Sequence, residues 1–433
     1  MSEGRWHWLM PGMRVKRWLL LSSMGVLAAL LGLWIGLGGA PAHWLDTVYR
    51  ALDTQIRVVA PSAPAAQVIR WGLGLALMAG GLGIWWWGLR RAWRTLVGIL
   101  QPRASGRVWD VLSRYALMLH GRRVVAIGGG TGLSTMLRGL KRYTANIVAI
   151  VTVTDDGGSS GRLRHELGIL PPGDIRNCLI ALADAEGTMT ALLQHRFKDG
   201  TGNLSGHSVG NLLIAAMTQI KGDFEQAIQE ISKVLAIRGR VLPSTLTHVN
   251  LRAEMEDGTY IDGETAIVEY PARIRRMHLN PPDVEPPPEA IEAIKQADVV
   301  VLGPGSLFTS VIPNLLVPKI ADALRTTDAI RVYVCNVMTQ PGETDRFTAS
   351  DHVRAIEAHA GGRVFDYVLV NTATPNPELL ERYRANGQDL VLPDIDRIRQ
   401  MGYKVITGDF ISQTDYVRHD PNRLAEAILR LAK

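Results

Sequence analysis

Two long runs without a charged residue lie near the N-terminus, at residues 18–40 and 71–89. An α-helix rises 1.5 Å per residue, so these runs would extend for roughly 34 and 28 Å, about the thickness of a bilayer core. Residues 40–42 (APA) faintly resemble a signal-peptide cleavage site. The preceding run, however, is too long for the apolar part of a signal peptide. The sequence therefore predicts two membrane-spanning helices.

Positive charge flanks both runs on the side away from the loop that joins them, at Arg14, Lys16 and Arg17 and again at Arg90 and Arg91. Short loops rich in Lys and Arg stay on the cytoplasmic side of a membrane. The joining loop also carries arginines, so the bias is modest. We expect a multi-pass protein of the cell membrane with both ends in the cytoplasm.

The excess positive charge belongs to the N-terminal part of the chain. Residues 1–120 hold 13 of the 47 basic and 4 of the 41 acidic residues, a net charge of +9, which leaves −3 for residues 121–433. A nucleic-acid-binding domain would carry its basic residues on the folded domain, so this distribution argues against a nucleic-acid partner. Cys178 and Cys335 are the two cysteines, which indicates a reducing compartment rather than a disulfide framework.

After residue 121 short apolar runs alternate with helical stretches, which predicts an α/β domain with a mostly parallel sheet and helices on both faces. An antiparallel hairpin is expected at about 246–280, around the turn Asp257-Gly258. We therefore predict a membrane anchor with a basic connector at 1–120 and one α/β domain at 121–433. The expected strands are Val124–Ile127, Ile147–Val153, Asp298–Leu302, Arg331–Cys335, Tyr367–Val370 and Lys404–Ile406.

The glycine-rich segment Gly128–Gly132 follows the first of these strands and opens a helix. Glycines let backbone N–H groups approach phosphate oxygens, and the N-terminal end of the helix adds partial positive charge. Leu133 stands where a complete dinucleotide motif would have its third glycine, and a tight turn without a ligand is the alternative. We expect Gly129, Gly130, Thr131 and Gly132 to contact a ligand.

Asp155 and Asp156 follow the second expected strand and precede a Gly/Ser-rich loop. An acidic residue at this distance from the glycines could bind a ribose hydroxyl, as in NAD sites. Two adjacent carboxylates could instead hold Mg²⁺ beside phosphates, or form a solvated turn. Gly157–Gly161 also matches G-x-S-x-G, but the motif requires a direct strand-to-helix turn, and two aspartates intervene here.

Further polar loops are expected at the same edge of the sheet, because parallel strands direct their carboxyl ends to one side. Asp174 is expected to be the N-cap of a helix that ends near Asp184. Ser208 is expected to cap another helix. The remaining candidates for ligand contact in these loops are Asn177, His207, Gly303, Gly305, Ser306 and Asn336. For His207 the alternative is a structural histidine whose hydrogen bonds are satisfied within the protein. The convergence of these loops indicates a binding site.

Together these segments resemble the YvcK/CofD-like family over residues 121–433, and its YvcK branch of gluconeogenesis factors in particular. The matching strings are GGGTGL, TDDGGSSGRLR, PPGDIRN, QHRF, GHSVGNL, GPGSLFTS, CNVMTQPGETD and RHD. The resemblance implies a Rossmann-like fold and binding of a nucleotide sugar, notably UDP-N-acetylglucosamine. It also implies a role in cell shape, envelope precursor supply and gluconeogenic growth.

The CofD branch of the family implies a different activity, the Mg²⁺-dependent transfer of a phospholactate unit from a nucleotide-activated donor. By motif, Asp155 and Asp156 would lie at the phosphates or the metal, and His207 and Asn211 would line the nucleotide pocket. The domain shows no nucleophile with an adjacent base, which favours a binding protein over an enzyme. The sequence assigns no catalytic residue. It is compatible with a homo-oligomer.

Overall fold

The computed structural model describes residues 15–37, 43–100, 121–184, 187–198, 200–413 and 417–432. The chain divides into two compact units, residues 1–115 and 116–433. The end of the first apolar run (38–40), residues 101–120 of the predicted basic connector and the basic residue Arg14 lie outside the described residues.

The N-terminal unit contains α1 (Val15–Leu37), α2 (His43–Val59) and α3 (Ala63–Leu100). By length and composition, Lys16–Leu37 and Ala63–Thr95 could each cross a membrane. The described parts of both predicted runs are therefore helical. A bent pair in the second unit, Leu307–Leu315 with Pro318–Thr326, passes the same test when it is counted as one span. Its apolar residues lie in the core of the α/β domain.

Glycines bring α1 and α3 into close contact. A Cβ atom added to Gly81 would lie 2.4 Å from the backbone nitrogen of Ala29, and one added to Gly32 would lie 2.5 Å from the carbonyl oxygen of Gly74. Small residues that let two backbones approach closely are the usual basis of helix packing in membranes. The two apolar helices are therefore built as a packed pair.

A parallel sheet of seven strands in the order β10-β9-β8-β7-β1-β2-β3 forms the centre of the second unit. The central strands are apolar on both faces, and every residue of β1 and β7 is buried, as expected when helices cover both sides of a sheet. The strands are β1 (Val124–Gly128), β2 (Ile147–Val151), β3 (Arg240–Pro243), β7 (Val299–Leu302), β8 (Ile330–Val334), β9 (Tyr367–Asn371) and β10 (Lys404–Gly408).

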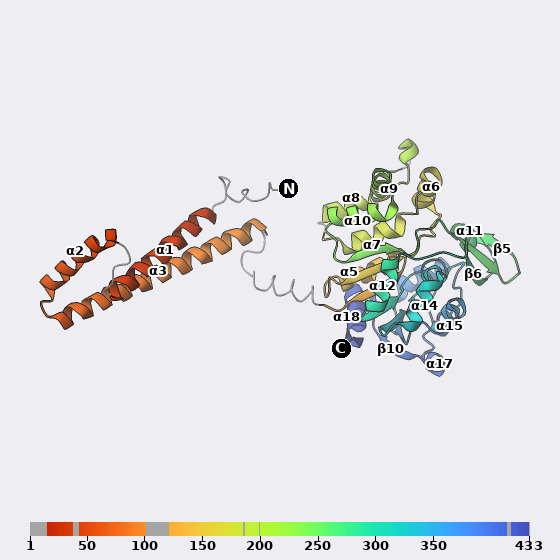
Figure 1. Ribbon diagram of the computed structural model, residues 1–433. Coiled ribbons are helices and arrows are strands. Elements are labelled where there is room, and N and C mark those ends of the chain that lie inside the picture. The colour runs from red at the N-terminus through yellow and green to blue at the C-terminus, as the bar shows by residue number, and fades with distance from the viewer. Residues whose placement is uncertain are drawn as a thin grey trace. The chain divides into compact units, whose positions relative to one another are not determined.

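The strand order reverses between β1 and β7. From β1 the chain continues outward to β2 and β3, whereas from β7 it continues in the opposite direction to β8, β9 and β10. Since parallel crossovers are right-handed, connections in opposite directions place their helices on opposite faces. Figure 1 shows the helices around this sheet. The loops after β1 and β7 therefore separate at a topological switch point, where ligands of such folds bind.

The helices of the α/β domain include one packed set of α5, α7 and α18 and a second pair, α12 and α14. Their bounds are α5 (Gly130–Leu140), α6 (Gly158–Leu167), α7 (Gly173–Leu182), α8 (Gly187–Gln194), α9 (Val209–Lys221), α10 (Phe224–Val234), α12 (Pro288–Gln296), α13 (Ile312–Leu315), α14 (Pro318–Thr326), α15 (Ala349–Ala360), α16 (Pro377–Ala385), α17 (Ile395–Gln400) and α18 (Pro421–Leu431). Two short irregular helices, η2 (Gly202–Leu204) and η3 (Leu307–Val311), complete the set.

The segment predicted as a hairpin is a three-stranded antiparallel sheet of β4 (Asn250–Met255), β5 (Tyr260–Asp262) and β6 (Ile274–Asn280), with α11 (Glu264–Glu269) between β5 and β6. Gly258 has a φ of +85° in the turn that joins β4 to β5, so the predicted turn is confirmed. Figure 1 shows β5, β6 and α11 together at one end of the domain. A two-stranded sheet of β11 (Ile411–Gln413) and β12 (Val417–His419) lies close to α5.

The six predicted strands are all present, with ends that differ by at most two residues. The strand β3 (Arg240–Pro243) was not predicted. It is a short edge strand with an exposed first residue and a terminal proline. A four-residue strand of this composition gives a weak signal, because proline is confined to the ends and edges of sheets.

Candidate functional site

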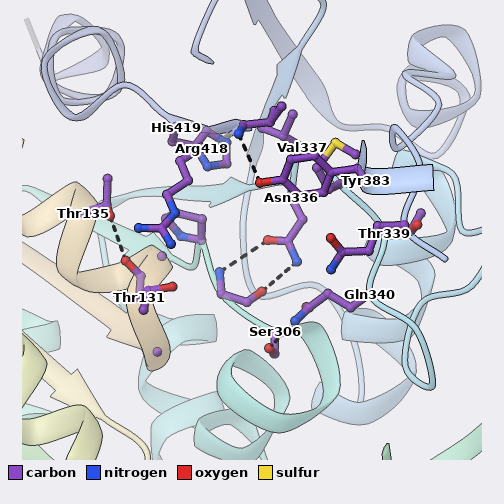
Figure 2. Close-up of a pocket in the computed structure, with 17 residues that line it drawn as sticks. Thr131, Thr135, Ser306, Asn336, Val337, Thr339, Gln340, Tyr383, Arg418 and His419 are labelled. Carbon is purple, nitrogen blue, oxygen red and sulfur yellow. Dashed lines mark hydrogen bonds between the residues drawn. The ribbon is translucent and has the colours of Figure 1, made fainter. Parts of the chain in front are cut away.

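A pocket of about 250 Å³ lies at the switch point, beyond the carboxyl ends of β1, β7 and β8 (Figure 2). Segments far apart in the sequence meet there because the sheet brings their strands side by side. The lining residues are Gly130, Thr131, Gly132, Thr135, Pro304, Gly305, Ser306, Asn336, Val337, Met338, Thr339, Gln340, Tyr383, Gln388, Val417, Arg418 and His419.

The loop after β1 provides the start of α5 as one wall of this pocket. Gly129 is extended, and Gly130 has a φ of +66°, a left-handed conformation that favours glycine. The backbone N–H groups of a first helical turn have no partner within the helix, so they can bind an anion. The predicted contact residues Gly130, Thr131 and Gly132 lie on this wall, whereas Gly129 lies just behind it.

Gly132 also sets the distance between the loops after β1 and β7. A Cβ atom at this position would lie 2.6 Å from the carbonyl oxygen of Pro304 and 3.0 Å from the backbone nitrogen of Gly305. Because real Cβ atoms do not approach so closely, only glycine allows the two loops to form adjoining walls.

The loop after β7 is held in place by side chains from the loop after β8. Asn336 accepts a hydrogen bond of 3.3 Å from the backbone N–H of Gly305 and donates one of 2.8 Å to its carbonyl oxygen. Gln340 donates to the hydroxyl of Ser306 at 2.7 Å. The predicted residues Gly305, Ser306 and Asn336 are therefore brought together in the pocket, as Figure 2 shows for the labelled pair Ser306 and Gln340.

Five lining residues from the C-terminal part of the chain were not predicted as ligand contacts: Tyr383, Gln388, Val417, Arg418 and His419. Arg418 is the one Lys or Arg among the described residues of the lining, and its side chain extends from β12 toward Thr131 and Thr135 (Figure 2). Tyr383 accepts a hydrogen bond of 3.1 Å from the backbone N–H of Val417, which joins α16 to β12. Arg418 is the first residue of the RHD string that carries the family resemblance, so the sequence did contain a motif at this position.

His419 differs from its neighbour Arg418 because it is buried. Burial lowers the pKa of His419 to about 4, so its imidazole is neutral at physiological pH. The positive charge that the side chains bring to the pocket is therefore that of Arg418.

A group of carboxylates lies on the other side of the Gly129-Gly130 turn. Asp174 accepts a hydrogen bond of 2.7 Å from the backbone N–H of Gly130. Burial raises the pKa of Asp174 to about 6, with a further increase from the charge of Asp155. The pKa of Glu264 is raised well above its ordinary value by burial and by these neighbouring carboxylates.

The prediction that Asp174 caps its own helix is wrong. The helix α7 begins at Gly173 and Pro172 occupies the N-cap position, so Asp174 lies inside the first turn. Its carboxylate bonds to the loop after β1 instead, because the fold brings that loop within reach. The predicted cap at Ser208 is confirmed, since its hydroxyl accepts a hydrogen bond from the backbone N–H of Asn211.

Asp155 and Asp156 are the residues predicted to hold Mg²⁺. Asp155 accepts a hydrogen bond of 2.9 Å from the backbone N–H of Gly157, and Asp156 accepts bonds of 3.1 and 2.9 Å from the backbone N–H and the hydroxyl of Thr265. Each bond uses Oδ1, and Oδ2 of neither residue accepts a hydrogen bond from the described part of the chain, which leaves two oxygens of the kind that Mg²⁺ binds together with water and phosphate. Within the described ranges, no three His, Cys, Asp or Glu side chains are arranged to hold a metal.

The predicted residues Asn177, His207 and Asn211 belong to a buried network rather than to the lining of the pocket. The hydroxyl of Ser159 bonds to Nδ1 of His207 and accepts from Nδ2 of Asn211, both at 3.0 Å. Arg176 donates at 2.9 Å to the side-chain oxygens of both Asn177 and Asn211. Burial lowers the pKa of His207. This network joins α6, α7 and α9 behind the carboxylate group.

Gly303 has a φ of +74° at the end of β7 and is not part of the lining. Its amide donates to the carbonyl oxygen of Ile127 at 2.9 Å, which continues the pairing of β7 with β1. Gly303 therefore turns the chain from the strand into the pocket loop.

Comparison with known proteins identifies relatives over the whole α/β domain. The family described as 2-phospho-L-lactate transferase CofD matches residues 124–411. The gluconeogenesis factor of Bacillus subtilis is 50% identical over 312 residues, which is 72% of this chain and 98% of the relative. A crystal structure of a UPF0052-family protein from Bacillus halodurans has a TM-score of 0.69 and 49% identity, and the match covers 71% of this chain and 99% of that one.

The N-terminal unit has a counterpart as well. A Nostoc protein provisionally named as a gluconeogenesis factor is 47% identical over 426 residues, which is 98% of this chain and 91% of the relative. The family match and these identities agree with the Rossmann-like fold and the loops described above. The chain belongs to the CofD/YvcK family and is a homologue of its gluconeogenesis factors.

Proposed function

We propose that the pocket at the switch point binds a nucleotide sugar of the UDP-N-acetylglucosamine type, and that the protein is a regulator. Its occupancy would adjust cell shape and the supply of envelope precursors during gluconeogenic growth. The observation that carries this proposal is that the first turn of α5 and Arg418 line the same pocket, with β12 packed close to α5. The choice of a UDP-sugar follows from the family resemblance.

The chemistry of a diphosphate suits this arrangement. The N–H groups of Thr131 and Gly132 in the first turn of α5 have no partner within the helix, so they can donate to phosphate oxygens, and the helix dipole favours negative charge there. The guanidinium of Arg418, which extends toward Thr131 and Thr135, can add a charge-assisted hydrogen bond to the same phosphate. Gln340 and Asn336 supply amide groups, which are suited to uracil or sugar hydroxyls.

We also propose that α1 and α3 anchor the protein in the cell membrane, with residues 1–120 as anchor and connector and residues 121–433 as the cytoplasmic domain. The two apolar helices and their glycine contacts support this proposal. A fusion of green fluorescent protein after Lys433 should fluoresce and sediment with the membrane fraction. A soluble fusion, or a membrane-bound one exposed to external protease, would contradict it.

The ligand is tested by thermal denaturation of the full chain in detergent with UDP-N-acetylglucosamine, NAD and GDP, each with and without Mg²⁺. We expect UDP-N-acetylglucosamine to raise the melting temperature without Mg²⁺ and to be recovered unchanged, because no hydroxyl of the lining is hydrogen-bonded to a His, Asp or Glu side chain among the described residues. If only NAD stabilised the chain, the ligand of the pocket would be a dinucleotide and not a nucleotide sugar.

A CofD-type transferase is the second candidate, favoured by Asp155 and Asp156 near the glycine loop and by the description of the matching family. Bound Mg²⁺ would offset phosphate charge in the transfer of a phospholactate unit. If the protein is such a transferase, GDP should raise the melting temperature only in the presence of Mg²⁺. The substitution Asp156→Asn should abolish this stabilisation. An Asp156→Asn chain that binds GDP normally in Mg²⁺ would exclude the metal assignment.

A further inference from the structure

A second pocket, of about 330 Å³, lies between α15, the start of β6 and the loop that precedes α15, and it shares no residue with the first. Four exposed arginines belong to its lining: Arg273, Arg275, Arg346 and Arg354. Asp345 and Asp351 are the acidic residues of the lining. The formal charge of the wall is therefore +2.

Two of the arginines are paired with carboxylates and two are not. Arg275 bonds to Glu254 at 3.0 Å, and Arg354 bonds to Asp351. Arg273 and Arg346 have no carboxylate within ion-pair distance among the residues that the structure describes. Their two positive charges are left for a ligand.

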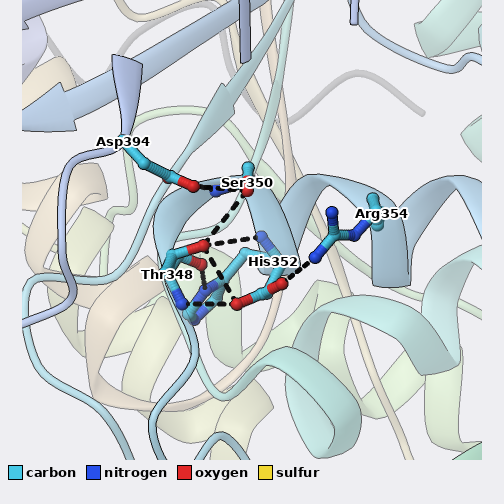
Figure 3. Close-up of polar contacts among 6 residues, drawn as sticks. Thr348, Ser350, His352, Arg354 and Asp394 are labelled. Atoms are coloured by element: carbon cyan, nitrogen blue, oxygen red, sulfur yellow. Dashed lines mark hydrogen bonds and ion pairs between the residues drawn. The ribbon is translucent and has the colours of Figure 1, made fainter. Parts of the chain in front are cut away.

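The carboxylates of the lining already bond to the backbone. Asp345 accepts a hydrogen bond of 2.8 Å from the amide of Gly342, and Asp351 accepts one of 2.8 Å from Thr348 in the capping box of α15. Figure 3 shows Thr348 at this cap and Arg354 beside the same turn. These bonds orient the two carboxylates toward the backbone, and neither carboxylate forms an ion pair with Arg273 or Arg346 among the described residues.

The inner part of the pocket is aromatic. Phe308 lies edge to face with Phe347 and with His359, with ring centres 6.0 and 5.8 Å apart. Nε2 of His359 accepts from the amide of Met277 at 2.9 Å, and Nδ1 bonds to the carbonyl oxygen of Ala355 at 2.7 Å. Burial lowers the pKa of His359, so this ring is neutral and the cations lie at the rim. An aromatic wall with a cationic rim suits an organic ring that carries a phosphate.

Arg346 adds a backbone observation. Its φ is +62°, one of two positive values among non-glycine residues of the described chain. Such a conformation costs on the order of 1–3 kcal/mol and is found at functional sites more often than elsewhere. Glycine would adopt the same backbone conformation without strain. The presence of arginine at this position therefore suggests a role for its side chain.

We propose that this arginine-lined pocket binds a soluble organic phosphate monoester, such as a sugar phosphate, at a site separate from the nucleotide pocket. The phosphate bonds to Arg346 and Arg273, and the organic part lies against Phe308 and Phe347. A phospholipid headgroup carries the same phosphate group as a soluble monoester. The experiment below distinguishes the soluble ligand from the lipid.

The test is calorimetric titration of the full chain in detergent with glucose 6-phosphate, with glucose as the unphosphorylated control. We expect glucose 6-phosphate to bind and glucose not to bind. Arg346→Gly should weaken the affinity by on the order of tenfold or more, because a charge-assisted hydrogen bond is lost. Glycine suits φ +62°, so this variant should fold at least as stably as the parent chain.

Two arginine variants outside the pocket locate the site. Arg122→Gln removes an exposed charge before β1, and Arg418→Gln removes the cation of the nucleotide pocket. Neither should change the affinity for glucose 6-phosphate more than about twofold, since screened charges at a distance contribute little. Loss of binding in Arg418→Gln, with normal binding in Arg346→Gly, would overturn the proposal and place the phosphate in the nucleotide pocket.

The source of the phosphate is tested with dihexanoylphosphatidic acid below its micelle concentration. We expect it to bind no more tightly than glucose 6-phosphate. Arg346-dependent binding of the lipid that is tighter than that of the sugar phosphate would overturn the assignment to a soluble ligand. Failure of the titration to detect glucose 6-phosphate at millimolar concentration would refute the site, whatever the nucleotide pocket binds.

Discussion

Oδ2 of Asp174 lies 2.7 Å from the backbone nitrogen of Gly130 and accepts its hydrogen bond, although 44 residues separate the two in the sequence. A buried carboxyl group thus holds the turn that begins α5. Since α5 forms the wall of the pocket that we propose to bind a phosphate, the protonation state of Asp174 is linked to the stability of the site.

We predict that Asp174→Asn raises the melting temperature at pH 8 and has little effect at pH 4.5. Burial raises the pKa of Asp174 to about 6 in the folded state, so the folded chain holds this proton more tightly than the unfolded chain. The stability contributed by this group therefore decreases as the pH rises from about 4 to about 6, and the penalty above that range is at most about 3 kcal/mol. Asparagine removes the charge and keeps an oxygen for Gly130.

The control for this prediction is Asp174→Ala, which removes the acceptor and should lower the melting temperature at both pH values. If Asp174→Asn were destabilising at pH 8, the charged carboxylate would be a net benefit to the folded state.

Arg418→Gln should weaken the binding of UDP-N-acetylglucosamine by roughly 10- to 100-fold, because a charge-assisted hydrogen bond to phosphate contributes about 1.5–3 kcal/mol. Arg418 is exposed, so the melting temperature without ligand should stay the same. Titration calorimetry measures the affinity, and Arg397→Gln on α17 is the matched control. Equal affinity in both variants would remove Arg418 from the nucleotide site.

Gly132→Ala should destabilise the chain by about 1–3 kcal/mol, since the added Cβ atom would meet the backbone of Pro304 at 2.6 Å and push the two loops apart. Thermal denaturation measures the effect. Gly187→Ala is the control, because a Cβ atom there has no neighbour within 4 Å. A melting temperature unchanged in Gly132→Ala would mean that the loops have room to move.

Gly81→Ile should separate α1 from α3, because a Cβ atom on Gly81 would lie 2.4 Å from the backbone of Ala29. The packing can be measured by oxidation of a cysteine pair that replaces Gly36 and Trp71, where an added Cβ atom on Gly36 would lie 3.7 Å from the Trp71 ring, an ordinary contact distance. We expect a high yield of disulfide in the parent, and a several-fold lower yield with Gly81→Ile.

Gly83→Ile is the matched control for the helix pair, because nothing lies within 4 Å of a Cβ atom at Gly83. Equal disulfide yields in the two isoleucine variants would argue that the helices pack through another face.

The loops of the pocket at the switch point could be predicted from the sequence where they follow strands. Gly130, Thr131, Gly132, Gly305, Ser306 and Asn336 were predicted in this way, and all six line the pocket. Their positions follow from a local rule, since the ends of parallel strands meet at one edge. Tyr383 and Arg418 follow no central strand, so no local pattern placed them there.

Hydrogen-bond partners could not be predicted, because they depend on which loops the fold brings together. Asp174 has the sequence context of a helix cap, yet its carboxylate bonds to Gly130. His207 and Asn211 lie in a polar, glycine-rich segment, yet both are buried in a network with Ser159. A polar residue in a loop can satisfy its hydrogen bonds inside the protein as well as on a ligand.

The sequence by itself determined the two apolar helices, the parallel sheet and the glycine loops, because these depend on short-range patterns of hydrophobicity and backbone freedom. The tertiary structure decided which loops face one another across the pocket. It placed Arg418 next to the first turn of α5, and it left Arg273 and Arg346 without carboxylate partners among the described residues beside an aromatic wall. Packing decides which charged side chains from remote segments lie near one another and at what distance. No local sequence pattern encodes these distances.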